Sequence, residues 1–433
     1  RDFCLSRGLG DVYKRQHQFM HNFDKTVEGS NKIYFNADSG NAKLTVDMWD
    51  YGNNEYDFAK YDTKFDEHGT KHTFKDELDN LDLHVNNDTA GVHANASEYV
   101  YVEVSTGEQL KGIQSAVTDT NGEALKYNYA LMGDINASHV ENYEAIGGKN
   151  GAFNGTFDGR GNRIIGLDTT KDSSGGNINS MTNAGIFSTV DDVESTGSVI
   201  AGSSSAVAGG LVGTNDGGLS NSFSDSAVTV KVDNQNPVTT TGGLGGVVGV
   251  NKGDVQFVDS LGVTNGGTNS DKVGGIIGVN NGNMYSGYNE SIVSGKDNVG
   301  GIIGVNTKTV SNIVNATGVV GTNNIGGLVG DNSNSVTNGR NNGTITGNTN
   351  VGGLVGDNGQ NAVLTDLVNA EAADIIGVTN VGGIAGSNAG TITTGKADDE
   401  DEKANLINRG SITGHTYVGG VAGTNSGLSL IHI

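Results

Sequence analysis

Cysteine and proline are almost absent from this sequence. The 433 residues include one of each, and the cysteine is Cys4. A single cysteine excludes a disulfide framework within the chain, and we expect no thiol chemistry. The single proline excludes a collagen-like triple helix, even though the chain contains 70 glycines.

Basic residues and long apolar runs are also scarce. The chain has 26 Lys and Arg against 49 Asp and Glu, which gives a net charge of −23 at pH 7. Such an acidic chain repels nucleic-acid phosphates and anionic membrane surfaces, so we expect no nucleic-acid partner. No apolar run approaches the roughly 20 residues that a membrane-spanning helix needs, so we expect no membrane span in this fragment.

The two ends of the chain are related through their coding DNA. Residues 11 to 16 read DVYKRQ, and residues 428 to 433 read LSLIHI. The DNA GATGTGTATAAGAGACAG encodes the first segment, and its reverse complement encodes the second. This DNA resembles the transposase end used in sequencing adapters. We therefore interpret residues 1–16 and 428–433 as adapter-derived, as in a bacterial metagenomic fragment, and expect them to join no regular structure.

Glycine is distributed unevenly, with five between 17 and 102 and 63 between 103 and 427. We place a boundary near residue 103. In 17–102, Val100, Val102 and Val104 alternate with other residues, as do Leu44 and Val46, which predicts half-buried strands. This irregular β region is interpreted either as early solenoid coils with long loops or as a small β domain.

A seven-residue motif recurs in 103–427: Gly-Gly, two apolar residues, Gly, a variable residue and Asn. Its copies are 26 to 37 residues apart and begin at Gly209, Gly245, Gly274, Gly300, Gly326, Gly352, Gly382 and Gly419. Helical repeats are excluded because each glycine would cost about 1 kcal/mol in a helix, and propeller blades need about 40 residues. We predict an all-β fold, a right-handed parallel β-helix (β-solenoid) with three-sided coils of about 26 residues.

Parallel stacking of such coils places equivalent residues in ladders. Residue i should pair with i+26 between about 273 and 350, so that Val299 lies between Val273 and Ile325. Stacked amides can donate and accept along the axis, and Asn tolerates sharp turns. We therefore predict a structural ladder of motif asparagines. They are Asn215, Asn251, Asn280, Asn306, Asn332, Asn358, Asn388 and Asn425.

The motif sequences GGLVGDN and GGIIGVN resemble the GLUG motif of bacterial surface adhesins, filamentous haemagglutinin-like proteins and some immunoglobulin-A-cleaving exoproteins. Upstream, VSTGEQLKGIQ and FNGTFDGRGNRIIGLD resemble the segment that often precedes such coils. The resemblance covers about 103 to 427 and implies the solenoid architecture and a secreted or outer-membrane-associated surface location. It does not by itself imply an activity.

Three features could suggest metal binding. His17 and His21 are four residues apart, as are His68 and His72, but both pairs lack the glutamate of His-Glu-x-x-His. The acidic run DDEDEK at 398–403 is interpreted as a solvated loop, with weak calcium binding as the alternative. We predict no metal site and no cofactor.

Two further features could suggest catalysis or nucleotide binding. NADSGN around Ser39 lacks a preceding glycine and recognisable His and Asp partners, and is interpreted as a turn. GGLGGVVG at 242–249 is followed by another coil rather than by the helix that a dinucleotide site requires. We predict no catalytic residue and no enzyme.

Three functions remain from different classes. The first is a fragment of a surface-displayed adhesin that binds host-surface glycans or proteins, or neighbouring bacterial cells, through many copies. The second is a carbohydrate-active β-helix enzyme, and the third is a structural cell-envelope spacer. We expect the longest insertions, near 219–241 and 391–417, to carry recognition, because loops on a rigid scaffold usually do.

Overall fold

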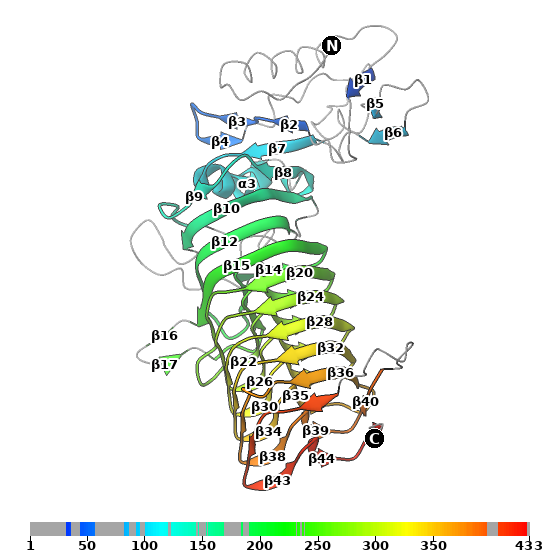
Figure 1. Cartoon of the computed structure of the whole chain (residues 1–433). Coiled ribbons are helices and arrows are strands. Elements are labelled where there is room, and N and C mark those ends of the chain that lie inside the picture. Colours follow the sequence, from blue (N-terminus) through cyan, green and yellow to red (C-terminus); the bar gives the residue numbers. More distant parts are fainter. Residues whose placement is uncertain are drawn as a thin grey trace. The chain divides into compact units, whose positions relative to one another are not determined.

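The computed structural model divides the chain into two compact units (Figure 1). Unit 1 comprises Arg1–Met132 and Gly155–Asp158, and unit 2 comprises Gly133–Asn154 and Gly159–Ile433. The residues that the structure describes are 32–35, 44–56, 82–85, 92–95, 100–119, 123–143, 146, 153, 155–168, 183–184, 190–230, 232–233, 236–237, 239–395 and 406–430.

Unit 1 contains short strands in three groups. Parallel pairing joins β2 (Leu44–Val46), β7 (Val100–Val104) and β8 (Asn128–Leu131). The strands predicted at 44–46 and 100–104 are therefore present. A second sheet contains β1 (Lys32–Phe35), β5 (Asp82–Val85) and β6 (Val92–Asn95), and β3 (Trp49–Asp50) forms a hairpin with β4 (Glu55–Tyr56). Tyr101 is buried together with Val100 and Val102, so β7 is covered on both faces rather than half-buried.

A helix in unit 1 was missed by the sequence analysis. Helix α3 (Gly107–Asp119) precedes a 3-10 turn, η3 (Glu123–Lys126). Its start is a capping box, in which Thr106 Oγ1 accepts a hydrogen bond from the Gln109 amide and Gln109 Oε1 accepts one from the Thr106 amide, each at 3.1 Å. The spacing of Thr106 and Gln109 is a sequence signal that could have predicted this helix.

Unit 2 is a parallel β-solenoid of about 8 turns with three parallel sheets and a repeat of about 29 residues. In each coil, the strand that ends at the first motif glycine belongs to sheet 1. The strand that ends at the motif asparagine belongs to sheet 2. Sheet 1 contains β11 (Asn183–Ala184), β13 (Val207–Gly209), β18 (Leu244–Gly245), β22 (Asp271–Gly274), β26 (Asp297–Gly300), β30 (Asn323–Gly326), β34 (Thr349–Gly352), β38 (Thr379–Gly382) and β43 (Thr416–Gly419). Sheet 2 contains β14 (Val212–Asn215), β19 (Val248–Asn251), β23 (Ile277–Asn280), β27 (Ile303–Asn306), β31 (Val329–Asn332), β35 (Val355–Asn358), β39 (Ala385–Asn388) and β44 (Ala422–Asn425).

Sheet 3 is bent, so that most coils contribute a long strand and then a short one. The long strands are β12 (Val190–Ala201), β15 (Gly218–Val230), β20 (Asp254–Ser260), β24 (Met284–Asn289), β28 (Val310–Asn315), β32 (Ser335–Asn341) and β36 (Val363–Asn369). After β36 the long strand is replaced by two short pieces, β40 (Thr391–Thr393) and β41 (Ile407–Asn408), and β40 pairs in turn with β45 (Leu428–Leu430). The short strands are β21 (Thr264–Asn265), β25 (Val293–Ser294), β29 (Val319–Val320), β33 (Ile345–Thr346), β37 (Ile375–Ile376) and β42 (Ile412–Thr413). At the N-terminal end of unit 2, β9 (Ile135–Asn136) pairs with Ile164 and Ile165 of β10 (Phe157–Asp168).

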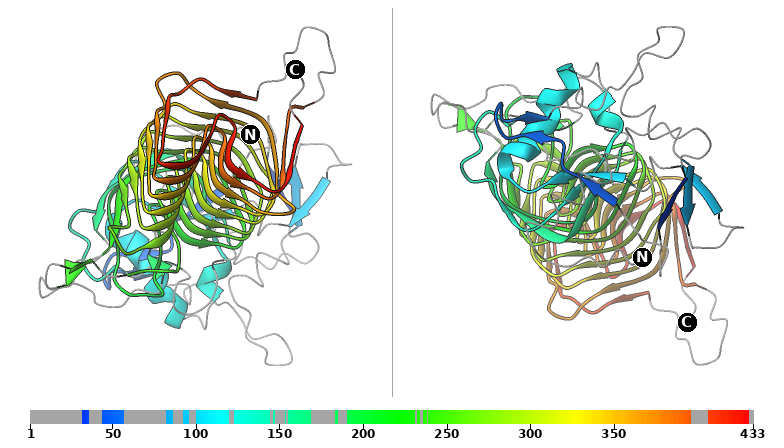
Figure 2. Two further views of the ribbon diagram at one scale, coloured as in Figure 1. Left: turned by 90° about the horizontal axis from the view of Figure 1, so that it is seen from below. Right: turned by 90° about the horizontal axis from the view of Figure 1, so that it is seen from above.

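The predicted register is confirmed. Val299 pairs in parallel with Val273 on one side and with Ile325 on the other, and Asn306 pairs with Asn280 and Asn332. Successive coils superimpose when unit 2 is viewed along the stack (Figure 2). The interval of 26 residues is therefore the length of one turn, and the longer intervals add residues between strands.

The motif itself forms the corner between sheets 1 and 2. In the coil at Gly300, both apolar residues of the motif, Ile302 and Ile303, are fully buried. A Cβ on Gly300 would collide with the Ile303 carbonyl oxygen, and a Cβ on Gly301 would collide with the Gly327 carbonyl oxygen of the next coil. Glycine is required at this corner because the backbone turns too tightly to hold a side chain.

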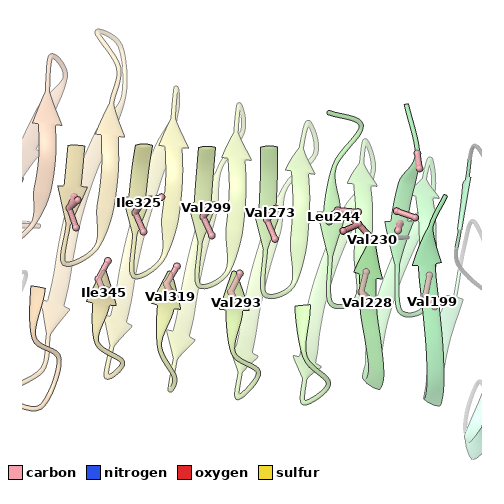
Figure 3. Close-up of a cluster of buried hydrophobic side chains, with 14 of the residues drawn as sticks. Val199, Val228, Val230, Leu244, Val273, Val293, Val299, Val319, Ile325 and Ile345 are labelled. Carbon is pink, nitrogen blue, oxygen red and sulfur yellow. The ribbon is translucent and has the colours of Figure 1, made fainter. Parts of the chain in front are cut away.

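The core of the regular coils is a double column of branched aliphatic side chains. Val273, Val299 and Ile325 of sheet 1 face Val293 and Val319 of sheet 3 (Figure 3). All five are fully buried. One coil alone could not bury these side chains, so each coil is stabilised by its neighbours.

Two expectations about the chain need correction. Leu428, in the segment expected to join no regular structure, begins β45, which pairs in parallel with β40. Backbone pairing at the edge of a sheet is tolerant of sequence, so a proline-free segment in register can join it. The insertion at 219–241, expected to be a loop, begins as the strand β15, which is followed among the described residues by a hairpin of β16 (Val232–Asp233) and β17 (Asn236–Pro237); its role in recognition stays a prediction. Residues 1–16 and 431–433 lie outside the described residues.

Candidate functional site

The eight motif asparagines lie in one ladder at the corner that follows sheet 2. Each Nδ2 donates to the Oδ1 of the equivalent asparagine in the next coil, in seven bonds of 2.6–2.9 Å from Asn215 to Asn425. The amides from Asn215 to Asn358 are fully buried. In Asn306, Nδ2 also donates to the Lys308 carbonyl oxygen at 2.7 Å, which closes the turn of its own coil. From Asn251 to Asn388 these amides are occupied by structural hydrogen bonds, whereas Asn215 Oδ1, at the first position of the ladder, has no partner among the described residues.

A second asparagine ladder was missed by the sequence analysis. It lies at the bend of sheet 3, where four bonds of 2.8–2.9 Å join five asparagines. They are Asn289, Asn315, Asn341, Asn369 and Asn408. The first three are 26 residues apart, a signal that was visible in the sequence. The second motif glycine makes room for this ladder, since a Cβ on Gly301 would lie 2.5 Å from the Asn315 amide carbon.

A third ladder runs in the opposite direction along sheet 1. Asn324 donates to Asn298, Asn350 to Asn324 and Asn380 to Asn350, at 2.7–2.9 Å. All four residues have a positive φ of 52–55°, a conformation that asparagine adopts more readily than other side chains. The abundance of asparagine is thus explained by turns and ladders, and a candidate site must be sought on the outer surface.

The outer face of sheet 3 repeats short polar side chains from coil to coil. One outward row in the regular coils reads Ser311, Thr337 and Thr365 in register. The two earlier coils that contain β20 and β24 differ from this pattern. Tyr285 of β24 pairs with Ser311 in this row, and Tyr288 of β24 and Phe257 of β20 are also exposed. We call Phe257, Tyr285 and Tyr288 the aromatic patch.

The aromatic patch is exposed and partly preorganised. The exposed fractions are 51% for Phe257, 49% for Tyr285 and 37% for Tyr288. The rings of Phe257 and Tyr285 meet edge to face, with centroids 5.5 Å apart and an interplanar angle of 79°. Phe257 has a φ of 54°, in the left-handed region that bulky residues avoid.

A polar groove adjoins the start of the same two strands. Its volume is about 510 Å³, and it is floored by glycine backbone. The side chains and glycines that define this corner groove include Lys252, Gly253, Asp254, Gly282, Asn283 and Lys308. Asn283 Nδ2 donates to Asp254 Oδ1 at 3.1 Å across its edge. The groove and the patch are continuous in sequence, since Asp254 begins β20 and Asn283 immediately precedes β24.

The charges around the groove are nearly balanced. Lys252 Nζ pairs with Asp216 Oδ1 at 2.8 Å in the preceding coil. Beside the patch, burial raises the pKa of Asp259, partly offset by a hydrogen bond from the Tyr288 backbone. Asp259 pairs in register with Tyr288, so a carboxyl group borders the aromatic rings.

Two carboxylate pairs lie elsewhere in register, Asp271 with Asp297 on sheet 1 and Asp331 with Asp357 on sheet 2. Asp331 and Asp357 occupy the same position in adjacent coils. Burial raises the pKa of the Asp331 carboxyl, and the neighbouring charge of Asp357 adds to this effect. Within the described part of the chain, no group of three or more His, Cys, Asp or Glu side chains could hold a metal ion.

The remaining features of the sequence analysis either form ordinary strands or lie outside the described residues. GGLGGVVG at 242–249 forms strands β18 and β19 of two sheets, without a following helix. Ser39, the histidine pairs at 17 and 21 and at 68 and 72, and the acidic run 398–403 lie outside the described residues. No helix in the described ranges has both the length and the apolar character that would let it cross a membrane.

Comparison with known proteins gives few matches. No protein-family model matches the chain, and no curated protein matches it. Among solved structures, the chain is similar to a crystal structure described as a putative immunoglobulin A1 protease from Bacteroides ovatus. The two are 15% identical, with a TM-score of 0.35, over 76% of this chain and 84% of the other.

Proposed function

We propose that the chain is part of a secreted or surface-displayed bacterial adhesin, in which the solenoid presents its outer faces for multivalent binding to host or bacterial surfaces. The observation that carries this proposal is the aromatic patch with its adjoining groove on an otherwise uniform, small-residue sheet face. Large exposed aromatic groups on a rigid scaffold are typical of binding surfaces.

The scaffold supports such a role because its register is maintained through consecutive coils. The three asparagine ladders and the aliphatic core fix the backbone, so that binding would require little ordering of the protein. A shallow surface of this kind binds weakly in one copy. Display of many copies on a cell converts weak contacts into strong attachment.

The test compares the full chain in monomeric and multivalent form. We expect little retention of the monomer on mammalian or bacterial cells, and at least about 100-fold stronger retention when the chain is coupled densely to beads. Beads coupled at low density serve as the control. If dense and sparse beads are retained equally poorly on all cells, the structural spacer becomes the better account.

The enzymatic alternative is favoured by one observation, the carboxylate pair of Asp331 and Asp357. Glycoside hydrolases use two carboxyl groups, one of which has a raised pKa. The corner groove, however, is lined by residues of other coils. We propose that the chain has no such activity, and we expect no release of reducing sugar from a polysaccharide panel. Turnover that Asp331→Asn abolishes would establish the enzyme instead.

A further inference from the structure

We propose that the aromatic patch and the corner groove together bind an uncharged glycan, with a pyranose ring against Tyr285 and Phe257 and its hydroxyl groups directed to the groove. The inference rests on the proposed binding function and names its site and ligand class. Four observations on the same two coils support it.

The first observation is an aromatic residue that the fold does not need. Phe257 adopts a φ of 54° and remains 51% exposed. Equivalent left-handed positions of the sheet hold Asn221, Ser286 and Asn312. A left-handed conformation is unfavourable for a bulky residue, and a side chain that stays in solvent gains little packing energy to offset it. Strain that packing does not explain points to a functional requirement.

The second observation is the chemistry of the neighbouring surface. A pyranose ring has an apolar face of C–H groups and a rim of hydroxyl groups. Tyr285 and Phe257 provide exposed ring surface for the apolar face, through dispersion and weak C–H contacts. Asp254 and Asn283, at the near ends of the same strands, provide acceptors and donors for hydroxyl groups. Side chains two residues apart on a strand lie on the same face, so Asn283 and Tyr285 point outward together.

The third observation is the size and floor of the groove. A volume of about 510 Å³ lies within the range of small-molecule sites. Gly218 and Gly253 line the groove with exposed or half-exposed backbone and no side chain, and a Cβ on Gly218 would meet nothing within 4 Å. A sugar can therefore approach the main chain closely at this corner.

The fourth observation is the local charge, which favours neither charged ligand class. The chain as a whole carries a charge of −23 and repels polyanions. At the groove itself, Lys252 and Lys308 are nearly balanced by Asp216 and Asp254, so no concentrated charge selects a cation. An uncharged ligand fits this balance.

Affinity electrophoresis tests the inference on the full chain. Because the protein is strongly acidic, it migrates well in a native gel, and an uncharged polysaccharide in the gel retards it on binding. The probes are a soluble β-glucan, a galactomannan and a dextran. We expect at least one to retard the wild type, with an affinity that persists at about 0.5 M NaCl, where charge interactions are screened.

Two variants make the result specific. Phe257→Asn should weaken the interaction with the polysaccharide at least tenfold. It should also raise the unfolding temperature, because asparagine adopts a positive φ more readily than phenylalanine. Tyr285→Ala should weaken the interaction by a similar factor. Tyr417→Ala is the control, because Tyr417 is 65% exposed and also has a positive φ of 54°, but lies on β43, outside the aromatic patch.

The inference is overturned if none of the three polymers retards the wild type, or if Phe257→Asn and Tyr285→Ala are retarded like the wild type. Bead adhesion of the same variants separates the two proposals. Undiminished adhesion by both variants would leave the adhesin proposal standing and place its binding site elsewhere.

Discussion

Asparagine has the same task at two corners of each regular coil, after sheet 2 and at the bend of sheet 3. One amide hydrogen closes a turn of its own coil, as in the bond from Asn306 to the Lys308 carbonyl, and the other joins the neighbouring coil. A leucine of similar size can do neither. The cost of losing such an amide is high because its partners in the stack are buried and have no water to replace it.

Replacement of a central ladder residue should therefore be strongly destabilising. In Asn306→Leu, Asn280 loses its acceptor, and Asn332 and the Lys308 carbonyl lose their donor. We expect a loss of about 2–4 kcal/mol in unfolding free energy, measured by urea titration with circular dichroism. Asn281→Leu is the matched control, because Asn281 is exposed at the equivalent turn of the preceding coil, where its Oδ1 accepts only a solvent-exposed bond from Thr307, and it should change stability by less than about 0.5 kcal/mol. Equal effects of the two changes would show that the ladder contributes nothing.

The second motif glycine should be equally intolerant of a side chain. In Gly301→Ala, the new methyl group would meet the Gly327 carbonyl oxygen and lie 2.5 Å from the Asn315 amide carbon. We expect the unfolding temperature to fall by several degrees, with a loss of about 3 kcal/mol or more. Gly318→Ala has its nearest contact at 3.5 Å and should be neutral or slightly stabilising. Comparison of the unfolding temperatures of the two variants with that of the wild type tests this prediction.

At the scale of the strand, parallel stacking brings identical residues together, which is favourable for amides and aliphatic groups but unfavourable for charges. Strands β31 and β35 show this, because Asp331 and Asp357 lie opposite one another. Like charges directly opposite cost about 0.2–1 kcal/mol.

The pH dependence of this pair follows from the raised pKa of Asp331. A carboxyl whose pKa is higher in the folded state stabilises the fold at low pH, and this contribution is lost as the pH rises through the folded pKa. Asp331→Asn should therefore raise stability by about 0.2–1 kcal/mol at pH 7. Below about pH 3, where the carboxyl is protonated in both states, the difference should disappear. Thermal unfolding across this range would contradict us if the variant were less stable at pH 7.

At the scale of unit 2, stability is distributed along one dimension. A central coil is covered on both sides, and Val299 and Ile325 are fully buried, whereas Val418 of the last described coil is 48% exposed. Repeat proteins of this kind are stabilised by nearest-neighbour interfaces. We expect amide hydrogen exchange to be slowest in β26 to β35 and much faster in β43 to β45. Uniform protection along the chain, measured by mass spectrometry, would indicate a single cooperative unit instead.

The sequence by itself determined the architecture of unit 2. Gly-Gly at a fixed distance from Asn specifies a sharp corner, and recurrence every 26 residues specifies parallel register, so that Val273, Val299 and Ile325 could be paired before the structure was known. These inferences succeed because each repeat makes the same local contacts with its neighbours. The position of α3 was also encoded, in the capping box at Thr106, although we did not use it.

Only the tertiary structure determined which part of the outer surface carries the aromatic patch and the corner groove. Phe257 and Tyr285 are 28 residues apart, in intervals of unequal length, and neither breaks the motif. Parallel pairing of β20 with β24 brings the two residues together. The left-handed conformation of Phe257 interrupts the inward–outward alternation of β20, so that the side chain of Phe257 faces the solvent. The corner groove likewise depends on stacking, because residues of successive coils line it together. Periodicity specifies which residues stack, but the bends of each coil determine which of them face the solvent.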